Sequence, residues 1–193
     1  MAAGKGLDDS PAEFERAARQ LYTARLRPEI MSEEIPAPQR IAPYSAAMTG
    51  DVVFAGEEIA TGRIVLLHDP AGNDAWHGTF RLVTFAKADV DPEMVRDPVI
   101  AEVGWTWLTD ALTANETTYI APSGSVTTVT SEGFGGLADD GSSAQLEIRA
   151  SWTPTSEIGA HVSAWGDLLC TVAGLPPLAP GVAMLPNRRA RKS

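Results

Sequence analysis

The residues best suited to chemistry are two histidines and two carboxylates at the ends of one short loop: His68, Asp69, Asp74 and His77. Such a set could bind a divalent metal ion or act as an acid–base pair. The spacing matches no zinc motif and no third histidine is near, so the alternative is that the carboxylates cap turns while the histidines make local hydrogen bonds. We predict no metal and no cofactor here, and keep a metal-dependent or acid–base enzyme using His68, Asp69 and His77 as an alternative.

A glycine-rich loop and a single cysteine are the other candidates for chemistry. Residues 133–136 (GFGG) lack the lysine of a phosphate-binding loop and are followed by Asp139 and Asp140, so we interpret them as part of a flexible hairpin connection. Cys170 has no adjacent basic residue to favour a thiolate, and we expect a small buried hydrophobe there. Because no catalytic set converges, the sequence favours a non-enzymatic protein.

The charge of the chain is acidic and unevenly distributed. The 193 residues carry a formal net charge of −10, although the C-terminal end is basic, with Arg188, Arg189, Arg191 and Lys192. The rest of the chain is therefore more acidic than the total and would repel phosphate backbones and anionic membrane surfaces. We expect neither a membrane nor a nucleic acid as partner, and keep nucleic-acid binding through the basic tail as an alternative.

Cysteine content and hydropathy indicate the compartment. A single cysteine excludes an internal disulfide, which fits a reducing environment. No apolar run approaches the roughly 18 residues that a membrane span needs, and the first residues lack the apolar core of a signal peptide. The sequence therefore predicts a cytoplasmic protein.

The elements that must position these residues begin with an amphipathic helix. Ser10 is the predicted cap and Pro11 suits the first helical position. An apolar stripe follows at helical spacing, made of Phe14, Ala17, Ala18 and Leu21, and Pro28 ends the helix. We expect one domain over residues 10–186, with disordered tails over residues 1–9 and 187–193.

Strands and two further helices account for the rest of the chain. We predict a strand over residues 41–48, a turn at Gly50 and Asp51, a continuation over 52–59, and a hairpin of residues 62–69 with 76–88. A helix over 98–114 precedes strands over 125–134 and 144–152, and a last helix begins after Pro154 and ends at Gly174. The predicted fold is α+β in the order αβββαββα: an antiparallel sheet of about five strands with helices on one face.

The central helix provides the predicted interface. Trp105 and Trp107 are two residues apart, so they cannot lie on the same face of the helix, and Leu108 adjoins them. Tryptophan is favoured at binding hot spots, so we expect these three residues to contact a partner. The sequence-based hypothesis is a non-enzymatic polypeptide-binding or scaffolding module that forms a homodimer.

Several short motifs carry a resemblance to a known family. They are residues 35–40 (IPAPQR), 67–72 (LHDPAG), Trp76 with 78–82 (GTFRL), 103–105 (VGW), 134–137 (FGGL), 147–152 (EIRASW), and Trp165 with Cys170 and 174–177 (GLPP). In these the chain resembles an uncharacterised actinobacterial family, the domain-of-unknown-function family numbered three thousand, which implies no activity. The predicted element order is also similar to that of type III secretion chaperone-like proteins, small acidic dimers that bind other polypeptides, and this likeness implies a chaperone-like binding role.

Overall fold

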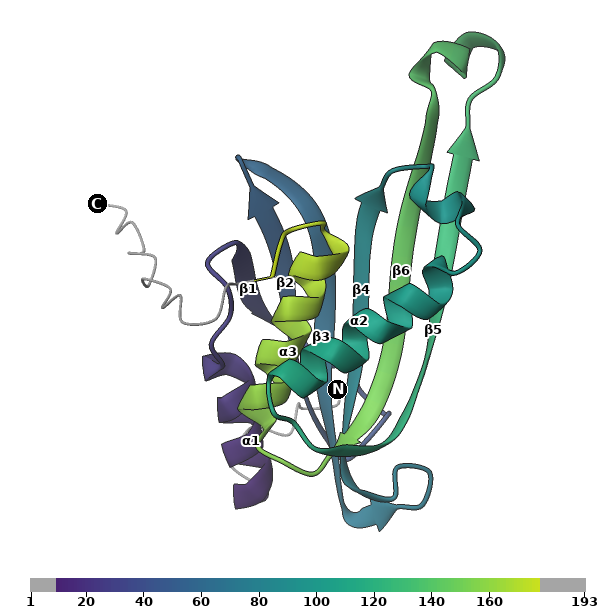
Figure 1. Cartoon of the computed structure of the whole chain (residues 1–193). Helices are drawn as coiled ribbons and strands as arrows, with labels where there is room; N and C mark the ends of the chain where they lie inside the picture. The colour runs from purple at the N-terminus through teal and green to yellow at the C-terminus, as the bar shows by residue number, and fades with distance from the viewer. Residues whose placement is uncertain (1–9, 178–193) are drawn as a thin grey trace, which may run out of the picture.

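A computed structural model describes residues 10–177 of the chain (Figure 1). Its elements, in chain order, are α1 (Ala12–Thr23), β1 (Ile30–Ile35), β2 (Tyr44–Phe54), β3 (Glu57–Asn73), β4 (Gly78–Val90), the 3₁₀ turn η2 (Met94–Arg96), α2 (Ile100–Ala114), β5 (Tyr119–Glu132), the 3₁₀ turn η3 (Gly135–Asp140), β6 (Ser142–Pro154) and α3 (Ile158–Val172). The tails predicted over 1–9 and 187–193 lie outside the described residues.

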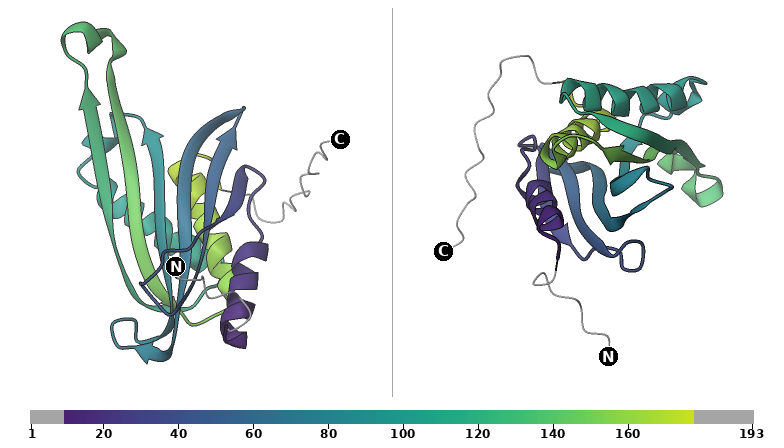
Figure 2. Two further views of the ribbon diagram at one scale, coloured as in Figure 1. Left: turned by 180° about the vertical axis from the view of Figure 1, so that it is seen from behind. Right: turned by 90° about the horizontal axis from the view of Figure 1, so that it is seen from below.

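The strands form one six-stranded antiparallel sheet in the order β1-β2-β3-β4-β6-β5. All three helices cover the same face of this sheet, as the views from the front, from behind and from below show (Figures 1 and 2). The predicted α+β class, with an antiparallel sheet and helices on one face, is confirmed. The sheet has six strands where about five were expected.

The main core lies between the sheet and α3, which α1 and α2 flank. Strand β6 alternates as the sequence predicts: Leu146, Ile148 and Trp152 face the helices and are buried, while Arg149 lies on the opposite face and is exposed. Trp165 of α3 is fully buried against this layer. Tertiary packing therefore fixes α3 over the middle of the sheet.

Two predictions in the first half of the chain are wrong. Residues Gly50 and Asp51 do not form a turn, because β2 runs unbroken through them and pairs Gly50 with Gly62 of β3. The turn lies at Ala55 and Gly56, where both residues have positive φ angles of 52° and 87°. The added strand, β1, pairs with β2 and was missed because its sequence, IMSEEI, has no buried alternation.

The helix ends follow the sequence in part. Ser10 makes no capping hydrogen bond to α1, and the helix stops at Thr23, before Pro28. Just before α2 begins, the Asp97 carboxylate accepts a hydrogen bond from the backbone N–H of Val99. The predicted stop of α3 is confirmed, because Gly174 has a φ of 78° and the Leu175 N–H bonds to the carbonyl of Cys170.

Candidate functional site

The residues of the predicted His68–His77 loop point in different directions. His68 lies on the helix-covered face of β3 and is 0% exposed. The Asp69 carboxylate accepts a hydrogen bond from the backbone N–H of Ala71, as a turn cap does. His77 is exposed in the β3–β4 turn with a φ of 56°. Within residues 10–177 no group of three or more His, Cys, Asp or Glu side chains is placed to hold a metal ion.

His68 joins α1 to the sheet through an aromatic stack. Its ring stacks on Phe80 with centroids 4.1 Å apart and on Phe14 at 6.0 Å, and Tyr44 lies at 6.1 Å. The Nδ1 atom lies 3.0 Å from the carbonyl oxygen of Thr79, which can only accept, so Nδ1 carries a proton. Full burial keeps this imidazole away from any substrate in the folded chain.

The second imidazole nitrogen of His68 faces a carboxylate. Its Nε2 lies 3.0 Å from Oε1 of Glu13, within ion-pair distance, yet the direction does not meet hydrogen-bond geometry. The contact places the start of α1 beside β3.

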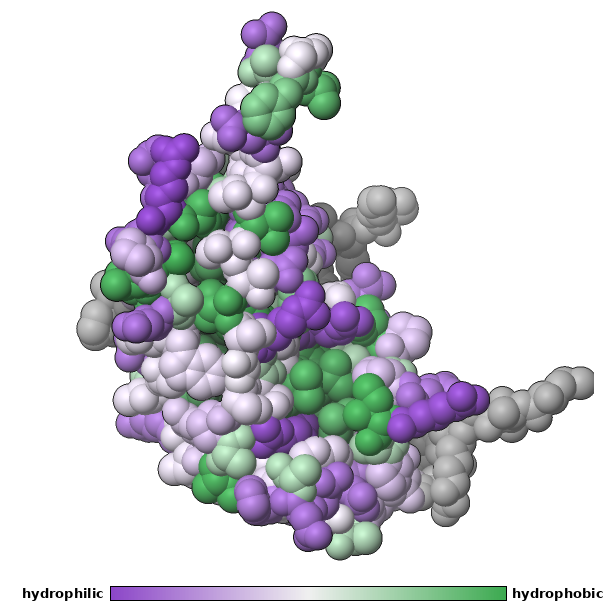
Figure 3. Space-filling view, turned by 90° about the vertical axis from the view of Figure 1, so that its right-hand side faces the viewer, coloured by the Kyte–Doolittle hydropathy of each residue, from purple (hydrophilic) through white to green (hydrophobic). Residues whose placement is uncertain are grey.

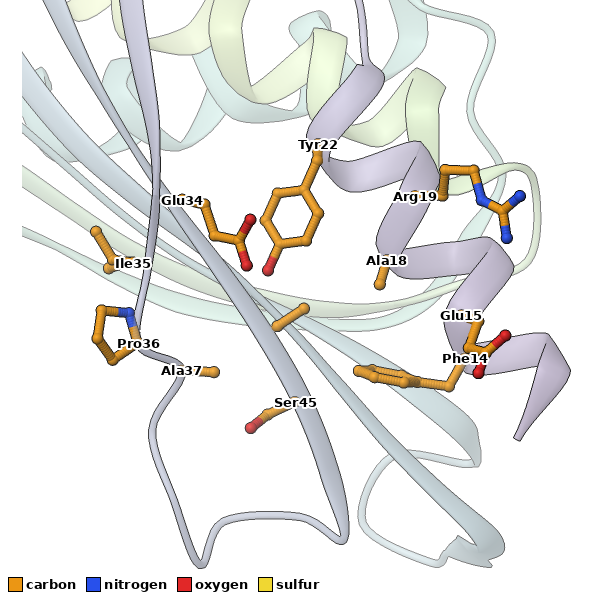
Figure 4. A pocket seen from close by; sticks show the side chains of 11 residues that line it. Phe14, Glu15, Ala18, Arg19, Tyr22, Glu34, Ile35, Pro36, Ala37 and Ser45 are labelled. Carbon is orange, nitrogen blue, oxygen red and sulfur yellow. The ribbon is translucent and has the colours of Figure 1, made fainter. Parts of the chain in front are cut away.

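A groove of about 1030 Å³ opens beside the same helix, between α1 and strands β1 and β2 (Figure 4). We call it the α1 groove. Its apolar lining comes from both sides and consists of Phe14, Ala18, Ile35, Pro36, Ala37 and Ala46. The polar lining residues are Glu15, Arg19, Tyr22, Glu34 and Ser45. The groove therefore combines an apolar floor with a few polar groups, as binding sites commonly do.

Tyr22 and Glu34 form the polar contact of the α1 groove. Figure 4 shows the two side chains pointing toward one another, Tyr22 from α1 and Glu34 from β1. Burial and the nearby Glu34 carboxylate raise the pKa of Tyr22 to about 12, so the phenol stays protonated at neutral pH. Glu34 itself is exposed and is available to a ligand.

The predicted interface residues of α2 face the rest of the chain. Leu108 is buried in the core. The ring of Trp105 packs on β5 at Gly124, where an added Cβ would lie 2.7 Å from it. Trp107 lies on another side of α2 and lines a cavity of about 340 Å³ with Arg27, Asp110 and Asp167. The two tryptophans do face different elements, and their contact with a partner stays a prediction.

A buried arginine that the sequence did not single out clamps β5 to β6. Arg81 of β4 is 7% exposed, and its guanidinium donates to the carbonyls of Ala121 and Ser151 and to the hydroxyls of Ser123, Ser151 and Thr153. It lies beside the irregularity in the β5–β6 ladder between Ile120 and Ser123. These acceptors occupy both terminal nitrogens of the guanidinium, so we assign Arg81 a structural role and not a ligand-binding one.

The hairpin connection predicted at residues 133–136 is present, and sequence reasoning missed only that it projects from the sheet with an apolar tip. Strands β5 and β6 extend well beyond the other strands and end in η3 (Figure 1). We call residues 131–143 the arm. Phe134 and Leu137, at its tip, are 77% and 62% exposed. The sequence feature that could have indicated this exposed tip is the presence of two large apolar residues in a glycine-rich turn.

The basic residues of the predicted nucleic-acid contact, Arg188, Arg189, Arg191 and Lys192, lie outside the described residues.

The fold and groove define an open-faced α+β protein: one antiparallel sheet with helices on a single face. The chain belongs to the family described as Protein of unknown function (DUF3000), whose model matches residues 10–183. This membership confirms the resemblance carried by the short motifs. No curated protein and no solved structure matches the chain. No helix within residues 10–177 is long and apolar enough to cross a membrane.

Proposed function

We propose that this protein is a non-enzymatic polypeptide-binding module and that the α1 groove is its binding site. The observation that carries the proposal is the apolar floor of the groove beside the exposed Glu34 carboxylate. The ligand that fits is an extended polypeptide segment with apolar side chains and one basic side chain. The apolar side chains would cover the floor, and the basic one would pair with Glu34.

Position in the sheet supports an extended ligand. Strand β1 pairs with β2 and has no other neighbour among the described strands, so it forms the edge of the sheet beside the groove. Residues Phe14 to Tyr22 line the groove over two turns of α1, a length of roughly 12 Å at 1.5 Å per residue, which matches about four extended residues. The net charge of the chain, −10, favours a basic segment.

The predicted element order and the single cysteine bear on the binding role and on the compartment of the protein. The chaperone-like binding role rests on the predicted order αβββαββα, whereas the structure has four strands before α2, so that likeness stays an expectation and the proposal rests on the α1 groove. The only cysteine, Cys170, is buried, and burial raises the pKa of its thiol to about 12. An unreactive single thiol suits a reducing compartment, and we propose that the protein acts in the cytoplasm.

The test is a selection from a random heptapeptide library, followed by fluorescence anisotropy with the selected peptides. We expect a consensus of apolar residues around one Lys or Arg, and weaker binding when Glu replaces that basic residue. E34Q should weaken binding about fivefold, which corresponds to about 1 kcal/mol for one exposed ion pair.

The matched control is E33Q, because Glu33 is the neighbour of Glu34 on β1 and its side chain points to the opposite face of the sheet. E33Q should bind the selected peptides like the wild type. Selection of no peptide, or equal binding by E34Q and the wild type, would show that the α1 groove is not a polypeptide site of this kind.

A further inference from the structure

The two edges of the sheet differ in length and charge. Strand β5 has 14 residues and forms one edge, with β6 as its only neighbour among the described strands. From Tyr119 to Ser131 it carries no charged residue, and Glu132 is the first. Strand β1, at the other edge, has 6 residues and carries Glu33 and Glu34. The β5 edge is thus a long row of unpaired backbone groups without charges.

Unpaired edges are a hazard that proteins usually reduce. Short edge strands, charged side chains and prolines are the common means of preventing another chain from pairing there. Strand β1 is short and acidic, and so is protected in this way. Strand β5 has Pro122 and an irregular register between Ile120 and Ser123, both near its start, and its central residues 125–131 are Ser, Val and Thr. This edge is suited to pairing with another strand.

Exposed apolar side chains gather along the same edge. Ile120 and Val129 on β5 are 43% and 44% exposed, and Phe134 and Leu137 at the arm tip are exposed as well. Figure 3 faces this side of the molecule and shows pale and green patches interrupted by purple hydrophilic ones, with green at the tip of the arm. Exposed apolar side chains beside an unpaired strand edge are typical of an interface.

We propose that two copies of the chain pair through their β5 edges, antiparallel, about a two-fold axis near Thr127. The regular part of the β5 edge supports this register. The β5–β6 register is continuous from Ser123 to Glu132, and Thr127 lies midway between Ser123 and Ser131, the two ends of its uncharged part. Antiparallel pairing about Thr127 therefore places Ser123 of one copy opposite Ser131 of its partner, so each contact occurs twice.

Charge selects β5 rather than β1 as the edge at which two copies can pair. Each copy has a net charge of −10, so two copies repel one another at most surfaces and come together best where charge is absent. Antiparallel pairing of β1 with itself would bring Glu33 and Glu34 of both copies together. Pairing through β5 leaves the α1 groove open, because the groove lies at the β1 edge.

Light scattering coupled to size-exclusion chromatography tests the association. We expect twice the monomer mass of 20.4 kDa for the wild type. T127K/T130K should be monomeric, since it places lysines on the pairing edge. Thr127 lies opposite Glu147 of β6 and Thr130 is exposed, so both lysines are compatible with the folded monomer. Circular dichroism checks that fold.

The matched control is T106K/T113K, which adds the same charge at exposed positions of α2 and should remain dimeric. A wild type that is monomeric at every concentration overturns the proposal. So does a dimer that T127K/T130K leaves intact, because the copies would then associate through another surface.

Single-cysteine scanning along β5 tests the register. Cys170 is buried and its thiol is unreactive, so a cysteine introduced at one of residues 123–131 is the accessible thiol of each variant. Mild oxidation should give disulfide-linked dimers that peak at T127C, where the two cysteines face one another, and fall off on both sides. Equal cross-linking at all positions, or a peak far from residue 127, overturns the proposed pairing.

Discussion

At the scale of single residues, His161 is a histidine held neutral inside the core. The indole N–H of Trp152 donates to its Nδ1 at 3.1 Å, so the ring proton is on Nε2, which donates to the Ser156 hydroxyl at 3.1 Å. Burial lowers the pKa of His161 from 6.5 to about 4. Protonation of Nδ1 would also oppose two donors, since the Trp152 N–H points at it.

The depressed pKa of His161 gives stability a pH dependence of definite sign. Between pH 6.5 and about 4 the unfolded chain binds a proton at His161 and the folded chain does not, so unfolding is favoured as the pH falls. The contribution is fully present above pH 6.5 and is lost toward pH 4, with a total of about 3 kcal/mol. Urea denaturation at a series of pH values measures it.

H161Q is the comparison that isolates this contribution, because the amide oxygen of glutamine can still accept from Trp152 and does not titrate. From about pH 7 to about pH 4 the wild type should lose about 3 kcal/mol more free energy of unfolding than H161Q. Parallel pH profiles for the two proteins would contradict this assignment.

At the scale of elements, α3 approaches the sheet over a pair of glycines. Gly50 of β2 and Gly62 of β3 lie opposite one another. An added Cβ at Gly62 would lie 2.4 Å from the Leu169 side chain and 2.9 Å from the carbonyl oxygen of Phe85. At Gly50 it would lie 2.8 Å from the Trp165 ring. These two positions lack side chains so that α3 can pack directly on the strands.

G62A should therefore lower the free energy of unfolding by about 1–3 kcal/mol, through overpacking between β3 and α3. The measurement is urea denaturation followed by tryptophan fluorescence, since Trp165 of α3 packs at Gly50, which is paired with Gly62. G136A is the control, because an added Cβ there meets no atom within 4 Å. It should change stability by less than about 0.5 kcal/mol. Equal stability of the two variants would show that the sheet adapts to the extra methyl group.

Local sequence patterns predicted the elements in which the order of apolar, polar and turn-forming residues matches their burial in the fold. The alternation of β6, the β3–β4 hairpin and the glycine stop of α3 are in the sequence and in the structure. Strand β1 is an edge strand with four exposed residues in its middle, so it has no hydrophobic period to recognise. Gly50 is explained by the helix that packs on it, more than 100 residues later, which local propensity cannot convey.

The candidate site was harder to predict than the fold, because it depends on tertiary packing that local sequence patterns do not convey. His68 was selected for its type and its neighbours along the chain, but alternation along β3 turns it toward α1 and away from Asp69. The α1 groove joins residues 14–22 with residues 34–46, and its shape depends on how α1 packs beside β1. Such a site follows from tertiary packing and carries no motif.

At the scale of the whole molecule, the arm stands apart from the core. Almost all described side chains of residues 131–143 are exposed, and none of these residues belongs to the main core. Replacing the arm by an Asn-Gly turn that joins Thr130 to Ala144, which are paired across β5 and β6, should change the free energy of unfolding by less than about 1 kcal/mol.

This comparison is made by urea denaturation in the T127K/T130K background, so that association of copies makes no contribution. The same background with the arm intact is the reference. A loss of several kcal/mol on removing the arm would mean that the hairpin tip stabilises the isolated chain, and the exposed tip would then need a structural explanation.

The unequal edges of the sheet decide where assembly stops. A sheet with two neutral edges can add copies at both ends and grow into an open fibre. In the proposed dimer the neutral β5 edges of both copies are paired. The two ends of the combined sheet are then the short β1 strands, which carry Glu33 and Glu34. Growth is therefore blocked at two copies. In the proposed dimer the acidic residues of β1 would thus limit polymerisation, a role that needs neither a ligand nor a catalytic group.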